Sequence, residues 1–189
     1  MKPQTAKQSE PIMRFFTPEL YLRFNSADEQ EADEANEAWE EAVASYQKHL
    51  ERLREQMPEE VKKLADSCFH DFILLAYDPR RTVLDKAKQG SLPSGDTLVI
   101  LSIEQESRVV SLYYVLGDHI RAASVPAKWP FSTDHVHWLY DEIDVEPQAA
   151  GFVHRILFSD GRTLEIPFVS VIKHDVPLAD VRGGLQQSA

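Results

Sequence analysis

The feature that most constrains the fold is a change in hydrophobic period near residue 68. Between residues 26 and 57, apolar residues recur every three or four positions, which is the period of one side of an α-helix. From residue 68 onward, short apolar or alternating runs of strand length take their place. Helices that precede the strands, rather than alternate with them, are typical of the α+β class. The sequence therefore predicts two or three N-terminal helices packed on a largely antiparallel β-sheet of six or seven strands.

The length of 189 residues is sufficient for one domain with a hydrophobic core. We expect a single α+β domain over residues 13–176, helical over 13–67 and mainly strands over 68–176. The polar residues 1–12 are predicted to form a disordered tail, and residues 177–189 a frayed C-terminal tail.

Local signals mark where the helices begin. Thr17 followed by Pro18 predicts an N-cap and the first residue of a short helix. Ser26 and Glu29 match a capping box, which predicts the start of a long helix, and Pro58 ends that helix and begins a second short one. The long helix carries one apolar stripe, interpreted either as its packing face on the sheet or as a seam for self-association. The stripe consists of Ala35, Trp39, Val43, Tyr46, Leu50, Leu53 and Met57.

The strand region is divided by turn signals. Gly117-Asp118 and Asp160-Gly161 predict hairpins, and the irregular alternation over residues 138–145 predicts a β-bulge. Cys68 is interpreted as a small core residue at the start of the first strand. The predicted strands cover residues 68–77, 97–103, 108–116, 120–125, 135–145, 152–158 and 163–172.

The net charge limits the classes of partner. A formal charge of −11 disfavours binding to nucleic acids and to anionic membranes, because phosphate recognition requires concentrated Lys and Arg. No apolar run approaches the roughly 18 residues that span a bilayer, and the start lacks the apolar core of a signal peptide. A single cysteine cannot form an internal disulfide, which suits a reducing compartment. We expect a cytoplasmic protein.

Acidic residues are concentrated in two places. Residues 28–41 contain eight Asp and Glu and neither Lys nor Arg, and a second acidic group follows at residues 141–146. Favourable charges at a helix N-terminus contribute about 0.3–1 kcal/mol each, which explains some of the first group but hardly all of it. The group is interpreted either as a solvated helix face or as a surface for a basic protein. The candidate partner-binding residues are Glu31, Glu34, Glu37, Glu41, Asp141, Glu142 and Asp144.

Histidines supply the candidate chemistry. His135 and His137 are two residues apart, so a strand would place both imidazoles on one face, where they could hold a divalent metal together with Asp141 or Glu142. His154 or His174 would be a further ligand of such a site. The alternative is that both histidines face solvent while Val136, Trp138 and Tyr140 occupy the buried face. No other cofactor is expected.

His70 and Asp71 form a second candidate pair, a base beside a group that could orient it. Because neighbours in a strand point to opposite faces, a structural role is favoured for both. The chain has no glycine-rich phosphate loop, no nucleophile elbow and no Cys-x-x-Cys pair. The sequence therefore does not indicate an enzyme.

The run of residues 13–25, MRFFTPELYLRFN, together with Phe69-His70-Asp71 and residues 152–168, resembles a family of small bacterial proteins of unknown function. The resemblance implies a bacterial origin and an ordered start near Met13, and the family offers no activity or site. At the level of the fold, the expected arrangement is similar to acidic immunity proteins of bacterial toxin systems, many of which block basic nucleases.

Three function hypotheses follow. The first is a non-catalytic, acidic interaction domain that binds a basic protein. The second is a metal-binding domain or metal-dependent hydrolase that uses His135 and His137. The third is a structural subunit that self-associates through four residues of the apolar stripe, Trp39, Val43, Tyr46 and Leu50. The sequence defines neither the partner nor the oligomeric state.

Overall fold

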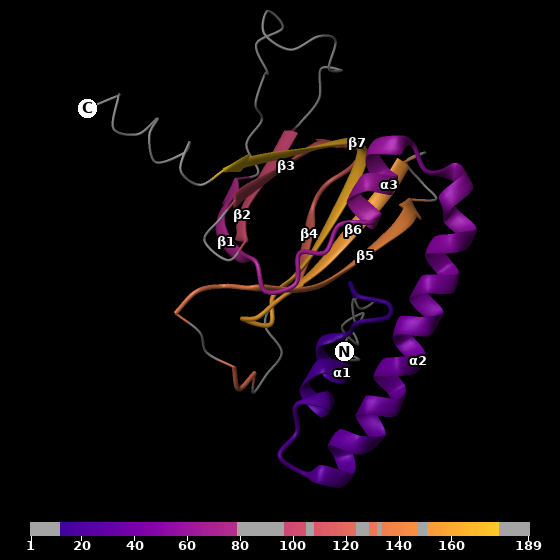
Figure 1. Cartoon of the computed structure of the whole chain (residues 1–189), viewed down its shortest axis with the longest axis vertical. Helices are drawn as coiled ribbons and strands as arrows, with labels where there is room; N and C mark the ends of the chain where they lie inside the picture. The colour runs from indigo at the N-terminus through magenta and orange to yellow at the C-terminus, as the bar shows by residue number, and fades with distance from the viewer. Residues whose placement is uncertain are drawn as a thin grey trace, which may run out of the picture.

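The computed structural model describes residues 12–78, 97–104, 108–123, 129–131, 134–146 and 151–177. Helices precede strands along the chain, and each strand pairing in these ranges is antiparallel, which confirms the α+β class (Figure 1). The predicted tails, apart from Ile12 and Pro177, lie outside the described residues. The elements are α1 (Pro18–Phe24), α2 (Glu29–Leu53), a 3-10 turn (Arg54–Gln56), α3 (Glu59–Ala65), β1 (Ile73–Asp78), β2 (Thr97–Glu104), β3 (Arg108–Leu116), β4 (Arg121–Ala123), β5 (Trp138–Glu146), β6 (Gly151–Phe158) and β7 (Thr163–Pro177).

The helix starts follow local capping chemistry, with one difference from the prediction. The Thr17 hydroxyl accepts a hydrogen bond from the Leu20 N–H at 3.2 Å, which confirms the predicted N-cap of α1. For α2 the N-cap is Asp28, whose carboxylate accepts from two N–H groups of the first turn. Ser26 instead donates its hydroxyl to the Glu31 carboxylate at 2.7 Å. The predicted capping box is therefore wrong, because the helix begins two residues later than expected.

The strand order is β1-β2-β3-β7-β6-β5, with β4 as an additional partner of β7. The 15-residue β7 pairs first with β4 and then with β3, so these two short strands follow one another along the same edge. They do not pair with each other, and the hairpin predicted at Gly117-Asp118 is wrong. At Asp160-Gly161 the hairpin is confirmed, because β6 and β7 pair and Gly161 has φ +80°.

The two ends of the strand order meet, which curls the sheet toward a barrel (Figure 1). Ile73, at the start of β1, forms a bridge with His137 beside β5. The Trp138 N–H also donates to the Phe72 carbonyl at 2.8 Å. The main hydrophobic core lies on the inner face of this curved sheet, and α3 contributes Val61 and Leu64 to it.

A second, smaller core lies on the outer face, between β5 and α2. Leu139 and Leu157 pack there against Trp39, Val43 and Tyr46 from the apolar stripe of α2. The stripe therefore packs within its own domain, as the first interpretation of it predicted. The seam postulated for self-association is occupied by the protein's own sheet.

The structure corrects the predicted start of the first strand. β1 begins at Ile73, because His70 and Asp71 form a turn in which Asp71 has φ +67°. Cys68, expected in the core, is exposed. The predicted β-bulge in β5 is confirmed by a register shift between Trp138 and Tyr140. Residues on either side of the bulge consequently have their faces exchanged, so Trp138 and Tyr140 do not share one buried face, as had been expected.

Candidate functional site

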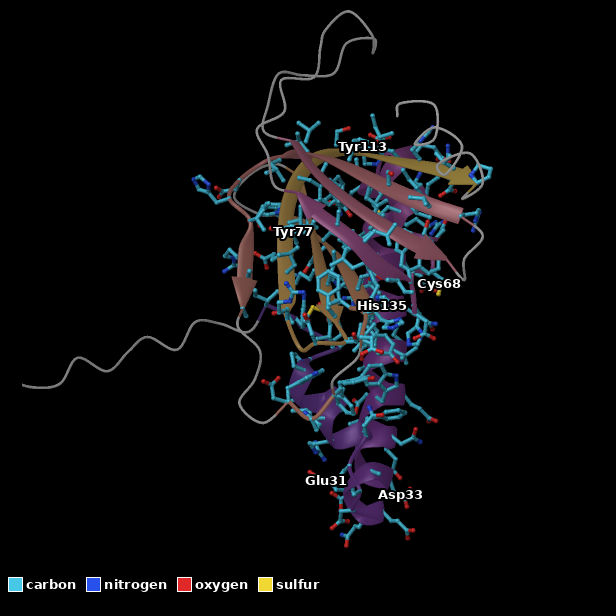
Figure 2. The ribbon with its side chains drawn as sticks, turned by 90° about the vertical axis from the view of Figure 1, so that its left-hand side faces the viewer. Glu31, Asp33, Cys68, Tyr77, Tyr113 and His135 are labelled. Carbon is cyan, nitrogen blue, oxygen red and sulfur yellow. The ribbon has the colours of Figure 1, made fainter. Side chains whose placement is uncertain are left out.

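The α1–α2 hairpin extends beyond the sheet, so the N-terminal half of α2 projects from the body of the protein (Figure 1). Figure 2 places Glu31 and Asp33 at the far end of this projection. Every acidic side chain in this half of the helix is exposed. We call this set the acidic face: Glu29, Glu31, Asp33, Glu34, Glu37, Glu40 and Glu41.

Little positive charge opposes the acidic face. Arg23 lies 3.9 Å from a Glu31 oxygen, with both side chains almost half exposed, and it is the one cation paired with the face in the described part of the chain. The remaining contacts are hydrogen bonds from neutral groups, such as Gln30 to Glu34 at 3.1 Å. Seven carboxylates therefore share one guanidinium, and their charge is directed into solvent.

The second acidic group is not such a surface. The β5 bulge and the strand alternation distribute Asp141, Glu142 and Asp144 over both faces of the sheet. Asp141 lies on the inner face with Ile143, whereas Glu142 and Asp144 lie beneath α2 and the N-terminal segment. Each of the three carboxylates is bound within the protein itself. They do not form the electronegative patch predicted for a partner.

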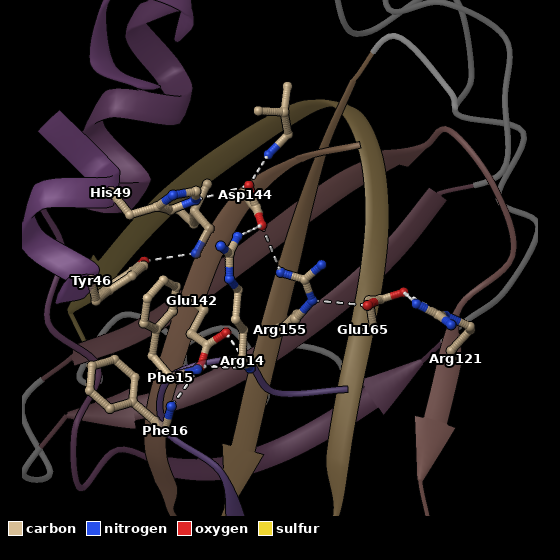
Figure 3. Close-up of polar contacts among 12 residues, drawn as sticks. Arg14, Phe15, Phe16, Tyr46, His49, Arg121, Glu142, Asp144, Arg155 and Glu165 are labelled. Atoms are coloured by element: carbon tan, nitrogen blue, oxygen red, sulfur yellow. Dashed lines mark hydrogen bonds and ion pairs between the residues drawn. The ribbon is translucent and has the colours of Figure 1, made fainter. Parts of the chain in front are cut away.

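Glu142 holds the segment 12–16, which we call the N-terminal strap. Its carboxylate is 1% exposed and accepts hydrogen bonds from three successive backbone N–H groups, those of Arg14 at 2.9 Å, Phe15 at 2.6 Å and Phe16 at 2.7 Å (Figure 3). Burial raises the pKa of Glu142, although these N–H groups and the charge of Arg155 act in the opposite direction. The carboxylate thus serves as an internal anchor for the start of the folded chain.

Asp144 is the centre of an ion network on the same face. Its carboxylate lies 2.9 Å from His49 Nε2, 3.2 Å from an Arg155 nitrogen and 3.5 Å from an Arg14 nitrogen. Burial acts to raise its pKa, but the Val145 N–H, His49 and Arg155 outweigh burial, and the pKa is lowered. Figure 3 shows that the network continues across the sheet, because Arg155 also binds the buried Glu165, which in turn binds Arg121.

Asp141 belongs to a buried polar chain inside the curved sheet. Its carboxylate accepts from Trp138 Nε1 at 3.0 Å and lies 3.0 Å from His154 Nε2. The other ring nitrogen of His154 lies 2.6 Å from the Tyr114 hydroxyl. With a proton on Nε2, the ring donates to Asp141 and accepts from the Tyr114 hydroxyl at Nδ1, so both ring nitrogens are satisfied. Since Trp138, His154 and Tyr114 are fully buried, this chain stabilises the core and offers no surface for a substrate.

The buried structural roles of His154 and Tyr114 were not predicted from the sequence, because each residue stands within an apolar strand and its partner is distant in the chain. A histidine at an inward position of a strand could have indicated a buried polar partner. The identity of that partner depends on the strand order, which the sequence does not contain.

The structure brings together one of the two candidate pairs, His70 with Asp71. His70 Nδ1 lies 3.0 Å from an Asp71 carboxylate oxygen, because both residues belong to a turn, so the expectation of opposite faces is wrong. His137 Nδ1 lies 3.3 Å from the Asp71 carbonyl oxygen, and His135 lies in the bend before β5. The charge of Asp71 also contributes, after burial, to a raised pKa for Tyr21.

The predicted metal ligands do not assemble into one shell. Asp141 and Glu142, which would complete a site with the two histidines, bind His154 and the N-terminal strap. In the described ranges, no group of three or more His, Cys, Asp and Glu side chains is placed to hold a metal ion.

No family model, no curated protein and no solved structure matches the chain. Among the described helices, none is both long and apolar enough to cross a membrane.

Proposed function

We propose that this chain is a non-catalytic interaction domain whose acidic face binds a basic protein. The supporting observation is the projection of seven exposed carboxylates, opposed by one guanidinium, on the part of α2 that extends beyond the sheet. The resemblance to acidic immunity proteins is consistent with such a partner, and a basic nuclease would be one example.

The acidic face is not explained by helix stability. Only the first turn benefits from the helix dipole, by about 0.3–1 kcal/mol per charge. Farther along, Asp33, Glu37 and Glu41 are spaced four residues apart, and like charges at this spacing cost about 0.2–0.5 kcal/mol per pair. A surface that slightly destabilises its own helix is consistent with selection for binding.

The geometry favours electrostatic recognition of a complementary surface. Exposed charges attract an oppositely charged protein over a distance, and they thereby increase its rate of association. The interaction should weaken with salt, because the Debye length falls to about 8 Å at physiological ionic strength and to about 3 Å at 1 M. The binding residues reduce to Glu31, Glu34, Glu37 and Glu41, since the β5 carboxylates have internal partners.

The test compares two variants of equal charge. The first replaces Glu31, Glu34, Glu37 and Glu41 with Gln. The matched control makes the same replacement at four exposed glutamates near the other end of the helices: Glu51, Glu55, Glu59 and Glu60. Each variant removes four negative charges, so both change the formal charge from −11 to −7.

The immobilised proteins are exposed to a bacterial lysate at low and high salt, and each captured basic protein is then purified and titrated against all three baits. We expect about tenfold weaker binding for the first variant, which corresponds to about 1.4 kcal/mol of binding free energy. The control should bind almost as well as the unmodified protein. Equal affinity for both variants would show that net charge, and not the acidic face, attracts the partner. Absence of any salt-sensitive basic partner for the unmodified protein would contradict the proposal.

A further inference from the structure

A small pocket opens at one end of the curved sheet, at a distance from the acidic face. The described core places α3 against β7 at one end, whereas the turn between β6 and β7 lies at the other end (Figure 1). The pocket is found at this second end, between β1 and β4. Its lining includes Leu74, Tyr77, Ala122, Phe158 and Leu164.

The pairing of the strands shows why space remains there. Ala122 lies opposite Leu164, and Leu164 lies opposite Ile156 of the main core, so these residues form one inward-facing row. In β4 the row ends with the methyl group of Ala122, whereas the other two residues of the row, Leu164 and Ile156, have large side chains. The volume left is about 100 Å³. The pocket is open to solvent, since both Ala122 and Tyr77 are exposed.

The volume limits the occupant. Sites for cofactors and drug-sized ligands occupy about 300–1,000 Å³, so a nucleotide or a complete acyl chain does not fit. Apolar cavities of about 150 Å³ are known to accept a benzene molecule. A pocket of about 100 Å³ with an open mouth therefore suits one ring or a branched alkyl group that protrudes slightly.

The residues that line the pocket determine the polarity of a ligand that can bind there. No carboxylate lines the pocket, although the chain carries a net charge of −11. The cation at its rim, Arg162, is already bonded through Nε to Asp160 at 2.6 Å. The polar lining residues besides Arg162 are Tyr77 and Thr163. The Tyr77 hydroxyl makes no hydrogen bond within the described part of the protein, so it can recognise a ligand. Mouths of β-barrels are frequent ligand sites, with an apolar body and a few polar groups.

We propose that this pocket binds the apolar end of a small neutral molecule, a single ring or branched alkyl group, with a hydrogen-bond acceptor that receives the Tyr77 hydroxyl. The site is separate from the acidic face, and it can be occupied whether or not a basic protein binds there.

The test uses two probes of equal size. Cyclohexanone offers a ring with a carbonyl acceptor, and toluene offers a ring without one. Each is titrated into the full chain while amide and methyl NMR shifts are recorded. We expect saturable shifts at Leu74 and Leu164, and tighter binding of cyclohexanone by roughly fivefold, since only cyclohexanone can accept a hydrogen bond from the Tyr77 hydroxyl.

Three variants examine the residues involved. Ala122→Leu fills the pocket and should reduce the binding of both probes at least tenfold. Ala76→Leu makes the same replacement beside Tyr77 at a position that does not line the pocket, and it should bind normally. Tyr77→Phe should remove the preference for cyclohexanone and leave the affinity for toluene unchanged.

The proposal is overturned if neither probe produces saturable shifts, if the shifts map away from Leu74 and Leu164, or if Ala122→Leu binds as well as the unmodified chain. If Ala122→Leu does not fold, as judged by its amide spectrum, the Tyr77→Phe comparison decides. Loss of the preference for cyclohexanone in that variant supports the site, and an unchanged preference overturns it.

Discussion

The two acidic groups of this protein have similar composition and opposite environments. On the projecting half of α2 the carboxylates are exposed and face solvent. On β5, Asp141, Glu142 and Asp144 are each bound by the protein's own N–H groups, histidines or arginines. The comparison shows that a cluster of acids in a sequence does not define a surface. Whether an adjacent element covers the cluster determines whether its charge is available to a partner or is used to hold the fold together.

The largest effect on stability is expected at Glu142. Replacement with Ala leaves three N–H groups of the strap without their acceptor, one of them fully buried. Each such loss costs about 1–3 kcal/mol, so we expect the free energy of unfolding to fall by about 3 kcal/mol or more. Urea denaturation measures this change.

Glu31→Ala is the control for Glu142→Ala, because Glu31 is exposed on the acidic face. Its effect should be within about 1 kcal/mol, the scale of a helix-end charge. Equal destabilisation by the two variants would show that the strap does not depend on its anchor.

The buried carboxylate on the inner face should have the next largest effect. Asp141→Ala removes the acceptor of Trp138 Nε1 and the partner of His154 Nε2. We expect a loss of about 2–3 kcal/mol in unfolding free energy, because two buried polar groups lose their partners. The tryptophan fluorescence should also change, and a variant of unchanged stability and fluorescence would mean that water replaces the carboxylate.

The pH dependence of stability separates the two acids beneath α2. The pKa of Asp144 is lowered below 3.8 in the folded protein. Its contribution to stability is therefore present above pH 3.8 and is lost as the pH falls through the folded pKa. The pKa of Glu142 is raised above 4.5, so the folded state binds the proton more tightly than the unfolded state does. The free energy of unfolding therefore falls as the pH rises from 4.5 through the folded pKa.

Unfolding free energies measured between about pH 3 and pH 6 test the opposite pH dependences expected for Asp144 and Glu142. Asp144→Asn should flatten the acid side of the profile, and Glu142→Gln should flatten the change above pH 4.5. A profile that neither variant alters would assign the pH dependence to other groups.

Local chemistry was predictable, and contacts distant in the chain were not. The cap at Thr17, the stripe of α2 and the bulge in β5 depend on residues within a few positions, and the sequence predicts all three. The strap lies 126 to 128 residues from Glu142, and His154 lies 40 residues from Tyr114. Those contacts require the strand order, in which β7 bends to reach β4 and β3 in turn.

The same reason explains the error about the β5 carboxylates. Asp141, Glu142 and Asp144 were predicted to bind a partner, because the sequence shows acids where a strand would have apolar residues. The bulge exchanges the faces, and α2 covers one of them, so the charges that seemed misplaced are satisfied from both sides. A charge in a strand that is covered by another element requires an internal partner, because an unpaired buried charge is costly.

The smallest effect belongs to the acidic face itself. Replacing Glu31, Glu34, Glu37 and Glu41 with Gln removes one favourable first-turn charge, and it relieves the repulsion of Glu37 with both Asp33 and Glu41. The lost charge is worth about 0.3–1 kcal/mol and the repulsion about 0.2–0.5 kcal/mol per pair, with opposite sign, so the free energy of unfolding should change by less than about 1 kcal/mol. Any difference should disappear near 1 M salt, where the screening length is about 3 Å. The loss caused by Glu142→Ala should persist in the same salt, because its hydrogen bonds are shielded from solvent. A large, salt-resistant effect on the acidic face would instead mean that these carboxylates, like those on β5, are used within the fold.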